Sequence, residues 1–394
     1  MAPKLTVGIL GAGHAGTALA AWFSSKRVPT YMWALEDHPG SLTAIRQQYG
    51  QVKASGLIEG VYLTTVCSNL SDLIASANFL ILATRADAHE QFVGNLESYN
   101  DQLTGKTLLV ICGHGFAVSY AYRLQFKRIL ETDDSPTTAK LTGDGGNEVH
   151  IKAMLPSFGV SCYPVKYDES GNTILPDSVE TVLTRRFQAS ITAISPLHSL
   201  FFSNYVIHAV SATLNIGRLR DPDESLTERA KGWREALDDR VGADQRFFFY
   251  GQGTNTYVCN VIKAADKERL AVAQALGITL DTVLEECNIQ SKTDYVNMRE
   301  FSLAPFPYNV NYACPDTLGH RYFSEEIRTM ELISVIAEAR GIKIPVTKSI
   351  MVLIKAARDD DPDTYSSSGS SSFNPFDLSI FGERSYPSEP AQEF

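Results

Sequence analysis

The sequence lacks several features that mark other classes of protein. Its six cysteines are scattered without a C-x-x-C pair, which suits neither a disulfide framework nor a zinc site. We therefore expect no metal site, and buried, reduced thiols in a cytoplasmic protein. A basic excess is also lacking, because 45 Asp and Glu outnumber 35 Lys and Arg and give a net charge of −10. A nucleic-acid partner is not expected, since nucleic-acid binding usually needs a basic face.

One run, from Leu5 to Phe23, contains no charged residue and therefore raises the question of a membrane segment. A signal peptide would need a basic region and a cleavage site of small residues, and a spanning helix would need about 20 apolar residues. Only Lys4 precedes the run, and three glycines interrupt it. We predict neither a signal peptide nor a membrane span.

Those glycines form the pattern Gly11-x-Gly13-x-x-Gly16, which lies between an apolar run and an apolar helical pattern. The first strand, tight turn and first helix of a dinucleotide-binding fold have this order. Gly11 would permit the turn, Gly13 would let the backbone approach a pyrophosphate, and Gly16 would let helix and strand pack closely. Free N–H groups at the helix start favour anions, so His14 and Ala15 are candidate cofactor-binding residues as well. Glycines with a purely structural role are the alternative.

Strand-like and helix-like segments alternate over the first half of the chain. After the opening strand, we predict a helix near 42–49 and strands over 29–34, 61–66, 79–82, 108–111, 139–142, 151–155 and 160–163. This alternation predicts an α/β fold, a Rossmann-like, doubly wound and mostly parallel sheet. We expect the alternation to end soon after the turn-rich segment 168–177.

Helical periodicity follows from about Thr192. We predict helices over 199–216, 226–239, 255–276, 279–287, 324–339 and 345–358, with Gly217, Gly277 and Gly341 as stops. The final residues are rich in Ser, Pro and acidic side chains, which is typical of a mobile tail, here with one docking segment, FDLSIF. The expected organisation is a Rossmann-like domain at 1–190, an all-helical domain at 191–358 and a low-complexity tail at 359–394.

One predicted helix carries a polar stripe on a surface that is otherwise apolar. Asn204, His208, Ser211 and Asn215 are spaced i, i+4, i+7 and i+11, so they share one face. A helix that is apolar nearly all round is buried, and its polar stripe must face hydrogen-bonding partners or a cavity. A functional histidine is favoured, and a structural one is the alternative.

A further group of polar residues lies farther along the chain. Ser324 is expected to cap a helix with Glu325 and Glu326 in its first turn, where the helix dipole favours carboxylates. Arg321, just before that helix, has the geometry to bind a carboxylate through two nitrogens. The alternative is a solvated helix start with a surface ion pair.

Residues that follow two of the strands lie at the edge where doubly wound sheets bind ligands. Thr84 and Arg85 follow the strand 79–82, and Gly113 and His114 follow the strand 108–111. We expect them to line the nicotinamide ribose, with ordinary strand-end loops as the alternative. His114 is a rival catalytic residue, but it lacks a supporting polar stripe.

The end of the second strand bears on the choice between NAD and NADP. Ala34 lies at the strand tip, Glu36 and Asp37 follow it, and no basic residue occurs before Arg46. Two carboxylates would repel a 2′-phosphate, so NAD is favoured and NADP is left open.

Three segments of the second half are similar to the opine dehydrogenase family, which includes octopine and nopaline dehydrogenases and metallophore-making members. They are SPLH…N-x-x-x-H-x-x-x-x-x-x-N-x-G, FFFYGQGTNTYVCNVIKAADKERLAVAQALGI, and HRYFSEE followed by GIKIP, and the resemblance spans residues 5–355. It implies a Rossmann domain that binds NAD(P)H and a helical domain that binds an amino acid and an α-keto acid. These small molecules would be joined through an imine by reductive condensation in the cleft between the domains. The oligomeric state is left open, a homodimer included.

The resemblance also implies roles for single residues. His208 corresponds to the catalytic histidine and Arg321 to the substrate-binding arginine, whereas Glu326 stands where the family has an aspartate partner. Glutamate is one methylene longer, so the dyad geometry is a departure from the family. Asn204 and Asn215 are expected to orient amide groups of substrate or cofactor.

Two other functions remain as alternatives. A simple hydroxy-acid dehydrogenase on the same two-domain plan would oxidise NADH with a keto acid and no amine. A non-catalytic NAD(P)-sensing protein would bind the nucleotide only, and the polar group around His208 argues against it because sensing needs no proton transfer.

Overall fold

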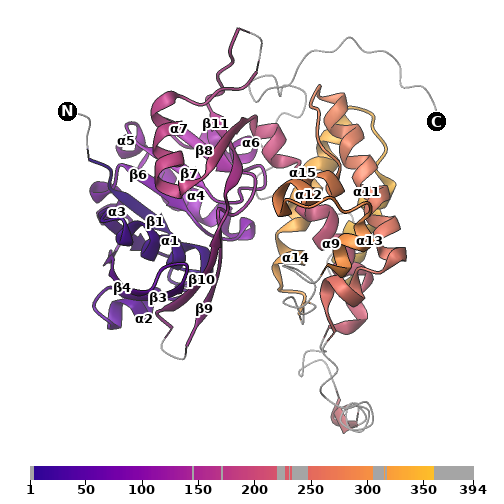
Figure 1. The fold of residues 1–394 in the computed structure, drawn as a ribbon, viewed down its shortest axis with the longest axis horizontal. Coiled ribbons are helices and arrows are strands. Elements are labelled where there is room, and N and C mark those ends of the chain that lie inside the picture. Colours follow the sequence, from indigo (N-terminus) through magenta and orange to yellow (C-terminus); the bar gives the residue numbers. More distant parts are fainter. Residues whose placement is uncertain are drawn as a thin grey trace. The chain divides into compact units, whose positions relative to one another are not determined.

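The computed structural model describes residues 4–143, 146–169, 172–219, 227–229, 231–232, 247–304, 315 and 317–358 (Figure 1). Contacts divide the described residues into two compact units. The first unit extends to Phe202 and includes Leu276–Ile278, and the second contains Ser203–Ala275 and the described residues from Thr279 onward. The predicted tail at 359–394, and most of the helix predicted at 226–239, lie outside the described residues.

The described part of the first unit contains two β-sheets. The larger consists of β1 (Val7–Leu10), β2 (Thr30–Trp33), β5 (Thr65–Val66), β6 (Phe79–Leu82), β7 (Thr107–Val110), β8 (Arg128–Thr132), β11 (Ser157–Tyr163) and β12 (Ser190–Ile194). Its strand order is β12-β11-β8-β7-β6-β1-β2-β5, and all neighbours are parallel except β8 and β11. The prediction of a mostly parallel, doubly wound sheet is confirmed.

A smaller sheet was not predicted. It consists of β3 (Gln51–Gly56), β4 (Gly60–Leu63), β9 (Thr137–Thr142) and β10 (Glu148–Met154) in the order β4-β3-β10-β9. The single strand predicted over 61–66 is wrong, because the run divides at Thr64 into β4 of this sheet and β5 of the larger one. Thr64 makes the division through its N–H, which donates to Gly50 O, and its hydroxyl, which donates to Thr30 O.

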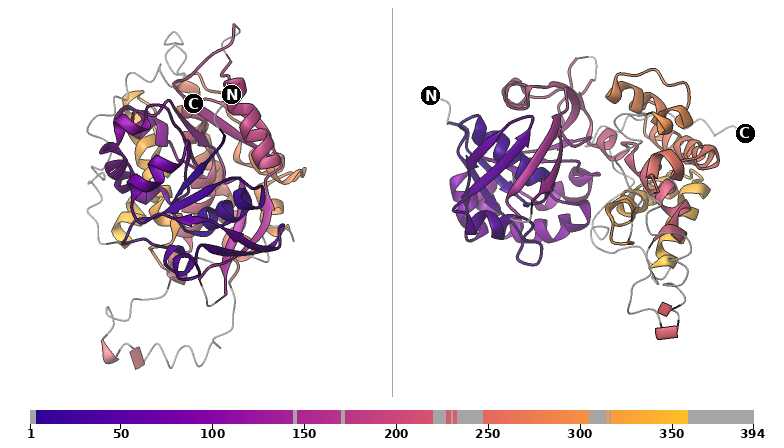
Figure 2. Two further views of the ribbon diagram at one scale, coloured as in Figure 1. Left: turned by 90° about the vertical axis from the view of Figure 1, so that its left-hand side faces the viewer. Right: turned by 60° about the horizontal axis from the view of Figure 1, so that its bottom comes forward.

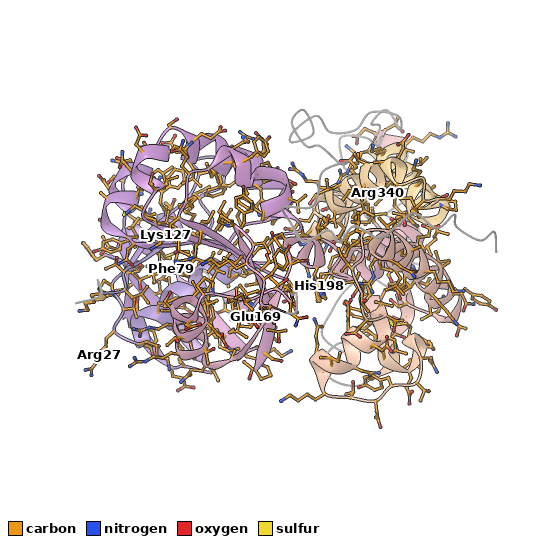
Figure 3. All side chains as sticks on the ribbon, turned by 90° about the horizontal axis from the view of Figure 1, so that it is seen from above. Arg27, Phe79, Lys127, Glu169, His198 and Arg340 are labelled. Carbon is orange, nitrogen blue, oxygen red and sulfur yellow. The ribbon has the colours of Figure 1, made fainter. Side chains whose placement is uncertain are left out.

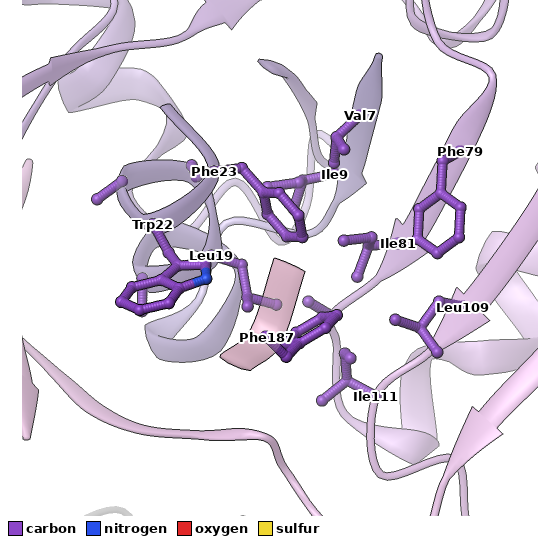
Figure 4. Packing of buried hydrophobic residues seen from close by; sticks show 14 of the residues in the cluster. Val7, Ile9, Leu19, Trp22, Phe23, Phe79, Ile81, Leu109, Ile111 and Phe187 are labelled. Atoms are coloured by element: carbon purple, nitrogen blue, oxygen red, sulfur yellow. The ribbon is translucent and has the colours of Figure 1, made fainter. Parts of the chain in front are cut away.

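Helix α1 (His14–Ser25) contacts β1 and β2 of the larger sheet as well as all four strands of the smaller one. Every residue from Gly16 to Phe23 is buried, and Leu19, Trp22 and Phe23 gather with Ile9 and Phe187 in one apolar cluster (Figure 4). Burying such side chains stabilises the fold by about 1.5–3 kcal/mol each. The charge-free run around α1 is therefore explained by burial between two sheets. Among the helices that the structure describes, none combines the length and apolarity needed to cross a membrane.

The other face of the larger sheet carries a second apolar cluster. Helices α3 (Leu70–Ser76), α4 (His89–Glu97), α5 (Asn100–Leu103) and α6 (Phe116–Tyr120) contribute to it, whereas α2 (Leu42–Gln47) and α7 (Asp177–Leu183) add residues to the cluster around α1. Figure 2 shows the sheet and its covering helices from two further sides. In Figure 3, Phe79 lies inside this unit and Arg27 at its outer edge. The alternation of strand and helix continues beyond residue 177, through α7 and β12 to α8 (Pro196–Leu200).

The described part of the second unit is helical, as predicted. Its helices are α9 (Asn204–Leu214), α11 (Thr256–Ala275), α12 (Val283–Ser291), α13 (Met298–Leu303), α14 (Arg321–Ser324), α15 (Glu326–Ala339) and α16 (Pro345–Ala357). Gly277 and Gly341, predicted as helix stops, have left-handed φ angles of 72° and 68°. Gly217 lies in the 3₁₀ turn Ile216–Arg218 that follows α9.

Two helix predictions need correction. The helix predicted over 199–216 is broken into α8 and α9, and the division between the units falls in the break, between Phe202 and Ser203. Ser324 does not cap the helix predicted over 324–339, because it is the last residue of the separate short helix α14. The cap of α14 is His320, whose Nδ1 accepts the Tyr322 N–H.

Buried charges connect the helices of the second unit. The Arg269 side chain is fully buried on α11, where it lies 2.8 Å from Asp266 Oδ1 and 2.6 Å from Glu286 Oε1 of α12. Glu268 of α11 accepts the N–H groups of Val346 and Thr347, both at 2.8 Å, at the start of α16. These pairs fix the helices against which α9 packs.

The cysteines agree with the expectation of reduced thiols. Four of the five described cysteines are buried and Cys112 is half-buried, and none of the five forms a disulfide with another described cysteine. Cys314 lies outside the described residues.

Candidate active site

His208 lies in the middle of α9, the helix that contacts α11, α14, α15 and α16. Only 6% of the residue is exposed. Apolar residues surround it along the helix, as the sequence predicted, so its ring nitrogens must find partners within the protein.

Both ring nitrogens of His208 have a polar partner. Nδ1 lies 3.0 Å from Oε1 of Glu326, the first residue of α15, and Nε2 lies 3.1 Å from the Tyr250 hydroxyl oxygen. An ionised carboxylate only accepts hydrogen bonds, so Nδ1 carries the proton in the neutral ring and Nε2 is left as an acceptor. The glutamate reaches the histidine, although it is longer than the aspartate that the resemblance implies at this position.

A tyrosine stacks on the imidazole, and an arginine lies over the ring of that tyrosine. The Tyr322 ring stacks on His208 with a centroid distance of 4.1 Å, and the Arg321 guanidinium lies 4.7 Å from the Tyr322 centroid. Burial, and secondly the positive charge of Arg321, hold the pKa of His208 well below its ordinary value of 6.5. His208 is therefore a neutral base at neutral pH.

Arg321 is the first residue of α14, and 41% of its side chain is exposed. Its Nη1 lies 4.0 Å from the Glu325 carboxylate, which is a long separation for an ion pair. Arg321 therefore lies next to the stacked rings of His208 and Tyr322, and its guanidinium is accessible to solvent.

The remaining stripe residues of α9 have other tasks. Asn215 Nδ2 donates to Gly253 O at 2.9 Å, and Ser211 Oγ lies 3.1 Å from Thr254 Oγ1. These residues seat the π-helical turn η6 (Phe249–Gly253), so this part of the stripe faces hydrogen-bonding partners rather than a cavity. Asn204 is the half-buried first residue of α9, one turn before His208.

Sequence reasoning missed the stacking Tyr322, and it also missed Tyr250. It lies on η6, 42 residues beyond His208, and helical periodicity relates residues only within one helix. The one available signal was its place in FFFYGQG, a segment that was noted for the family resemblance alone.

The glycine-rich turn follows β1 in the first unit. A Cβ atom on Gly16 would overlap Gly11 O, and Gly11 has a φ of 105° that side chains rarely adopt. A Cβ atom on Gly13 would meet nothing within 4 Å. The space above Gly13 is open to a ligand, whereas Gly11 and Gly16 are needed by the fold itself.

His14 and Ala15 begin α1 directly after this turn. His14 Nδ1 accepts the Leu141 N–H of β9 at 3.1 Å, so the smaller sheet is attached to the glycine-rich turn. Burial, together with the nearby positive charge of Lys140, lowers the pKa of His14. Ala15 is half-buried.

The strand-end candidates follow adjacent strands of the larger sheet. Thr84 lies beside Gly11, since β6 and β1 are neighbours, and Ala34 follows β2 on the other side of β1. Ala34 is buried, whereas Glu36 is exposed beyond it. The Arg85 guanidinium pairs with Asp87 in the turn Ala86–Ala88.

The loop after β7 is shaped by a buried carboxylate from β8. Glu131, 0% exposed, accepts the N–H groups of Gly115 at 2.7 Å and Ala117 at 3.0 Å at the start of α6. Burial raises the pKa of Glu131, and these N–H groups oppose the rise. A Cβ atom on Gly113 would overlap the Glu131 side chain, and His114 has a left-handed φ of 52°. Gly113 is thus a requirement of this loop.

The structure brings together His208, Glu326 and Arg321 in the second unit, and in the first it places Thr84 beside Gly11. Among the described residues, no group of three His, Cys, Asp or Glu side chains could hold a metal ion.

Two family models match the chain. The model for the NAD/NADP octopine/nopaline dehydrogenase alpha-helical domain matches residues 195–358, and the model for coenzyme F420-dependent NADP oxidoreductases matches residues 6–112. D-nopaline dehydrogenase of Agrobacterium tumefaciens (strain T37) is 48% identical over 380 residues, which cover 96% of this chain and 92% of the relative.

Solved structures share the fold at low identity. Octopine dehydrogenase with NADH and L-arginine is 14% identical with a TM-score of 0.67, and the match covers 98% of this chain and 100% of that one. Yersinopine dehydrogenase with NADP+ bound is 14% identical with a TM-score of 0.66 and matching coverage of 91% and 92%.

Proposed function

Because this chain belongs to the octopine/nopaline dehydrogenase family and is an NAD(P)-dependent opine dehydrogenase, we propose that His208 is its proton-transferring residue. The observation that carries this role is the 3.0 Å contact between Nδ1 of His208 and Glu326, two buried residues 118 positions apart. In the reaction, an amine and an α-keto acid lose water to give an imine, which hydride from the nicotinamide reduces to a secondary amine.

His208 suits the proton transfers of this reaction. Its neutral ring has its lone pair at Nε2, where the Tyr250 hydroxyl contacts it, and Glu326 fixes this tautomer and would stabilise the imidazolium that forms when Nε2 takes up a proton. The carboxylate of a substrate is assigned to Arg321, whose solvent-accessible guanidinium matches it in charge and shape. Asn204, one turn from His208, is assigned to a substrate polar group.

The dinucleotide is assigned to the first unit, with its pyrophosphate above Gly13 at the start of α1. The ribose and nicotinamide would follow the strand ends at Thr84 and Gly113. The exposed carboxylate of Glu36, with Asp37 beside it, favours NAD over NADP by repelling a 2′-phosphate. The ratio of kcat/KM for NADH and NADPH tests this preference, and Glu36→Gln should lower the ratio.

The role of His208 is tested by His208→Ala. We expect kcat to fall about 10²-fold or more while the Kd for NADH stays unchanged, because the variant removes a proton-transfer group and leaves the nucleotide site intact. Near-normal turnover would refute the role.

The condensation itself is tested by following NADH absorbance with a panel of keto acids, first alone and then with amino acids. NADH oxidation should require the amino acid. Oxidation at full rate with keto acid alone would identify a hydroxy-acid dehydrogenase instead.

A cytoplasmic location and a homodimer are further proposals. The scattered spacing of the six cysteines supports the first, since it does not form a disulfide framework and disulfides are rare in the cytoplasm. Cell fractionation tests the location, and light scattering of the purified enzyme tests the dimer.

A further inference from the structure

Tyr250 contacts Nε2 of His208, the ring nitrogen that the Glu326 carboxylate does not contact. Its hydroxyl lies 3.1 Å from Nε2, and the residue is 4% exposed. Phe249 and Phe301 pack edge-on against the Tyr250 ring with centroid distances of 5.0 and 6.0 Å. Aromatic neighbours therefore fix the plane of the phenol.

The turn that carries Tyr250 is held from two sides. Asn215, the C-cap of α9, donates to Gly253 O, and Arg299 of α13 donates through Nη1 to Gly251 O at 2.8 Å and to Thr254 O at 3.0 Å. Since Asn215 is the C-cap of α9, the helix that carries His208, the Tyr250 hydroxyl and the imidazole are held in place relative to each other.

The hydrogen-bond directions follow from the donor inventory. With the Nδ1 proton donated to Glu326, neutral His208 offers a lone pair at Nε2, and the phenol donates its proton to it. Protonation of Nε2 would create a second N–H donor facing the phenol, so the hydroxyl would have to turn within a buried site. A hydrogen bond to the neutral form of a group disfavours its charged form.

We propose that Tyr250 is a positioning residue whose hydroxyl keeps Nε2 of His208 unprotonated and thereby sets the pH range in which His208 is a base, a role that rests on the function proposed above for His208.

Charged groups also influence the protonation of His208. The effect of the Tyr250 hydroxyl can be measured separately from the effects of these charges. Glu326 on α15 favours the imidazolium, and Arg321 on α14, with Glu325 beside it, disfavours it. Buried charges of the other helices that pack on α9 are paired with one another, namely Arg269 with Asp266 and Glu286, and Lys355 with Glu331. Removing the Tyr250 hydroxyl changes a neutral donor and leaves every one of these charges in place.

The experiment is an NMR titration of the full-length enzyme with ¹⁵N-labelled histidine, in which the His208 signals are assigned by their loss in His208→Gln. In Tyr250→Phe the pKa of His208 should rise by about half to one unit, which corresponds to the loss of one neutral hydrogen bond. The acidic limb of the kcat/KM profile should move upward by the same amount. The matched control is Tyr257→Phe, which removes a phenol hydroxyl from a residue 80% exposed on α11 and should leave the titration unchanged.

A second substitution allows the same measurement if the Tyr250→Phe variant does not fold. Replacement of Tyr250 by 3-fluorotyrosine keeps the ring and makes the hydroxyl a stronger donor, so the pKa of His208 should fall. A titration of His208 that is unchanged, or that shifts in the opposite direction, in whichever variant folds would overturn the role of Tyr250. Full turnover by His208→Ala would refute the proton-transfer role instead, because the NMR titration reports on the imidazole whether or not it is catalytic.

Discussion

Among the described residues, each unit buries one carboxylate completely, and the two carboxylates have different partners. Glu131 of the first unit accepts backbone N–H groups at the start of α6, and Glu326 of the second contacts the His208 imidazole. Backbone N–H groups cannot titrate, so Glu131 can only fix a loop. An imidazole can gain and lose a proton, so Glu326 can influence a reaction. The comparison shows that the partner of a buried carboxylate, more than its burial, decides its role.

The largest difference between the two carboxylates is expected in catalysis, when Glu326 is replaced by glutamine. The amide can donate to Nδ1 and so favours the tautomer with its proton on Nε2, which removes the base, and we expect kcat to fall about 10²-fold or more. Steady-state kinetics with matched NADH binding measures the loss. Glu326→Asp should retain part of the activity, because it keeps the charge but shortens the reach. Equal activity of wild type and Glu326→Gln would contradict the pairing.

Glu131→Gln should change stability rather than chemistry. An amide nitrogen in place of one carboxylate oxygen faces a backbone donor, and the free energy of unfolding should fall by about 2 kcal/mol. Urea denaturation followed by circular dichroism measures it. An unaltered midpoint would show that the loop after β7 does not depend on Glu131.

The pH dependence of stability should have opposite signs for the two sites. The pKa of His208 is lowered on folding, so the unfolded chain binds more protons just below pH 6.5, and stability is lost as the pH falls through this range. The pKa of Glu131 is raised on folding, so the native state binds more protons just above pH 4.5, and stability is lost as the pH rises there. Each group contributes a slope of at most about 1.4 kcal/mol per pH unit. Denaturation curves at several pH values measure these slopes. His208→Gln should remove the slope below pH 6.5, and Glu131→Gln should remove the slope above pH 4.5. Slopes of the same sign for the two sites would contradict the comparison.

The smallest effect is expected in Asn215→Ala, which removes the hydrogen bond to Gly253 O. Stability should fall by about 1 kcal/mol, and kcat should fall a few-fold because η6 holds Tyr250 less firmly. Thermal denaturation and kinetics measure both changes. A loss of kcat as large as that of Glu326→Gln would give Asn215 a direct role in the reaction.

Prediction from the sequence succeeded where one local pattern carries the information. The glycine-rich turn, the apolar strand at 79–82 and the helical placement of His208 each depend on residues close in sequence, and they lie where they were predicted, whereas β3, β8 and β12 were not predicted. Prediction failed at Thr64, because the two halves of the run 61–66 join different sheets, and periodicity within a segment does not report its pairing partner. The hydrogen bond from Asn215 to Gly253 O was not foreseen for the same reason, since the two residues are 38 positions apart.

The amino-acid sequence by itself determined the alternation of strands and helices, the open glycine turn and the choice of His208, because each is a matter of side-chain size, polarity and short-range spacing. The resemblance pointed to Glu326 as the partner of that histidine, but only the tertiary structure decided that Glu326 reaches Nδ1 and that Tyr250 faces Nε2, since both come from separate elements. The proton affinity of an imidazole depends on such neighbours and on burial, and packing alone brings them together.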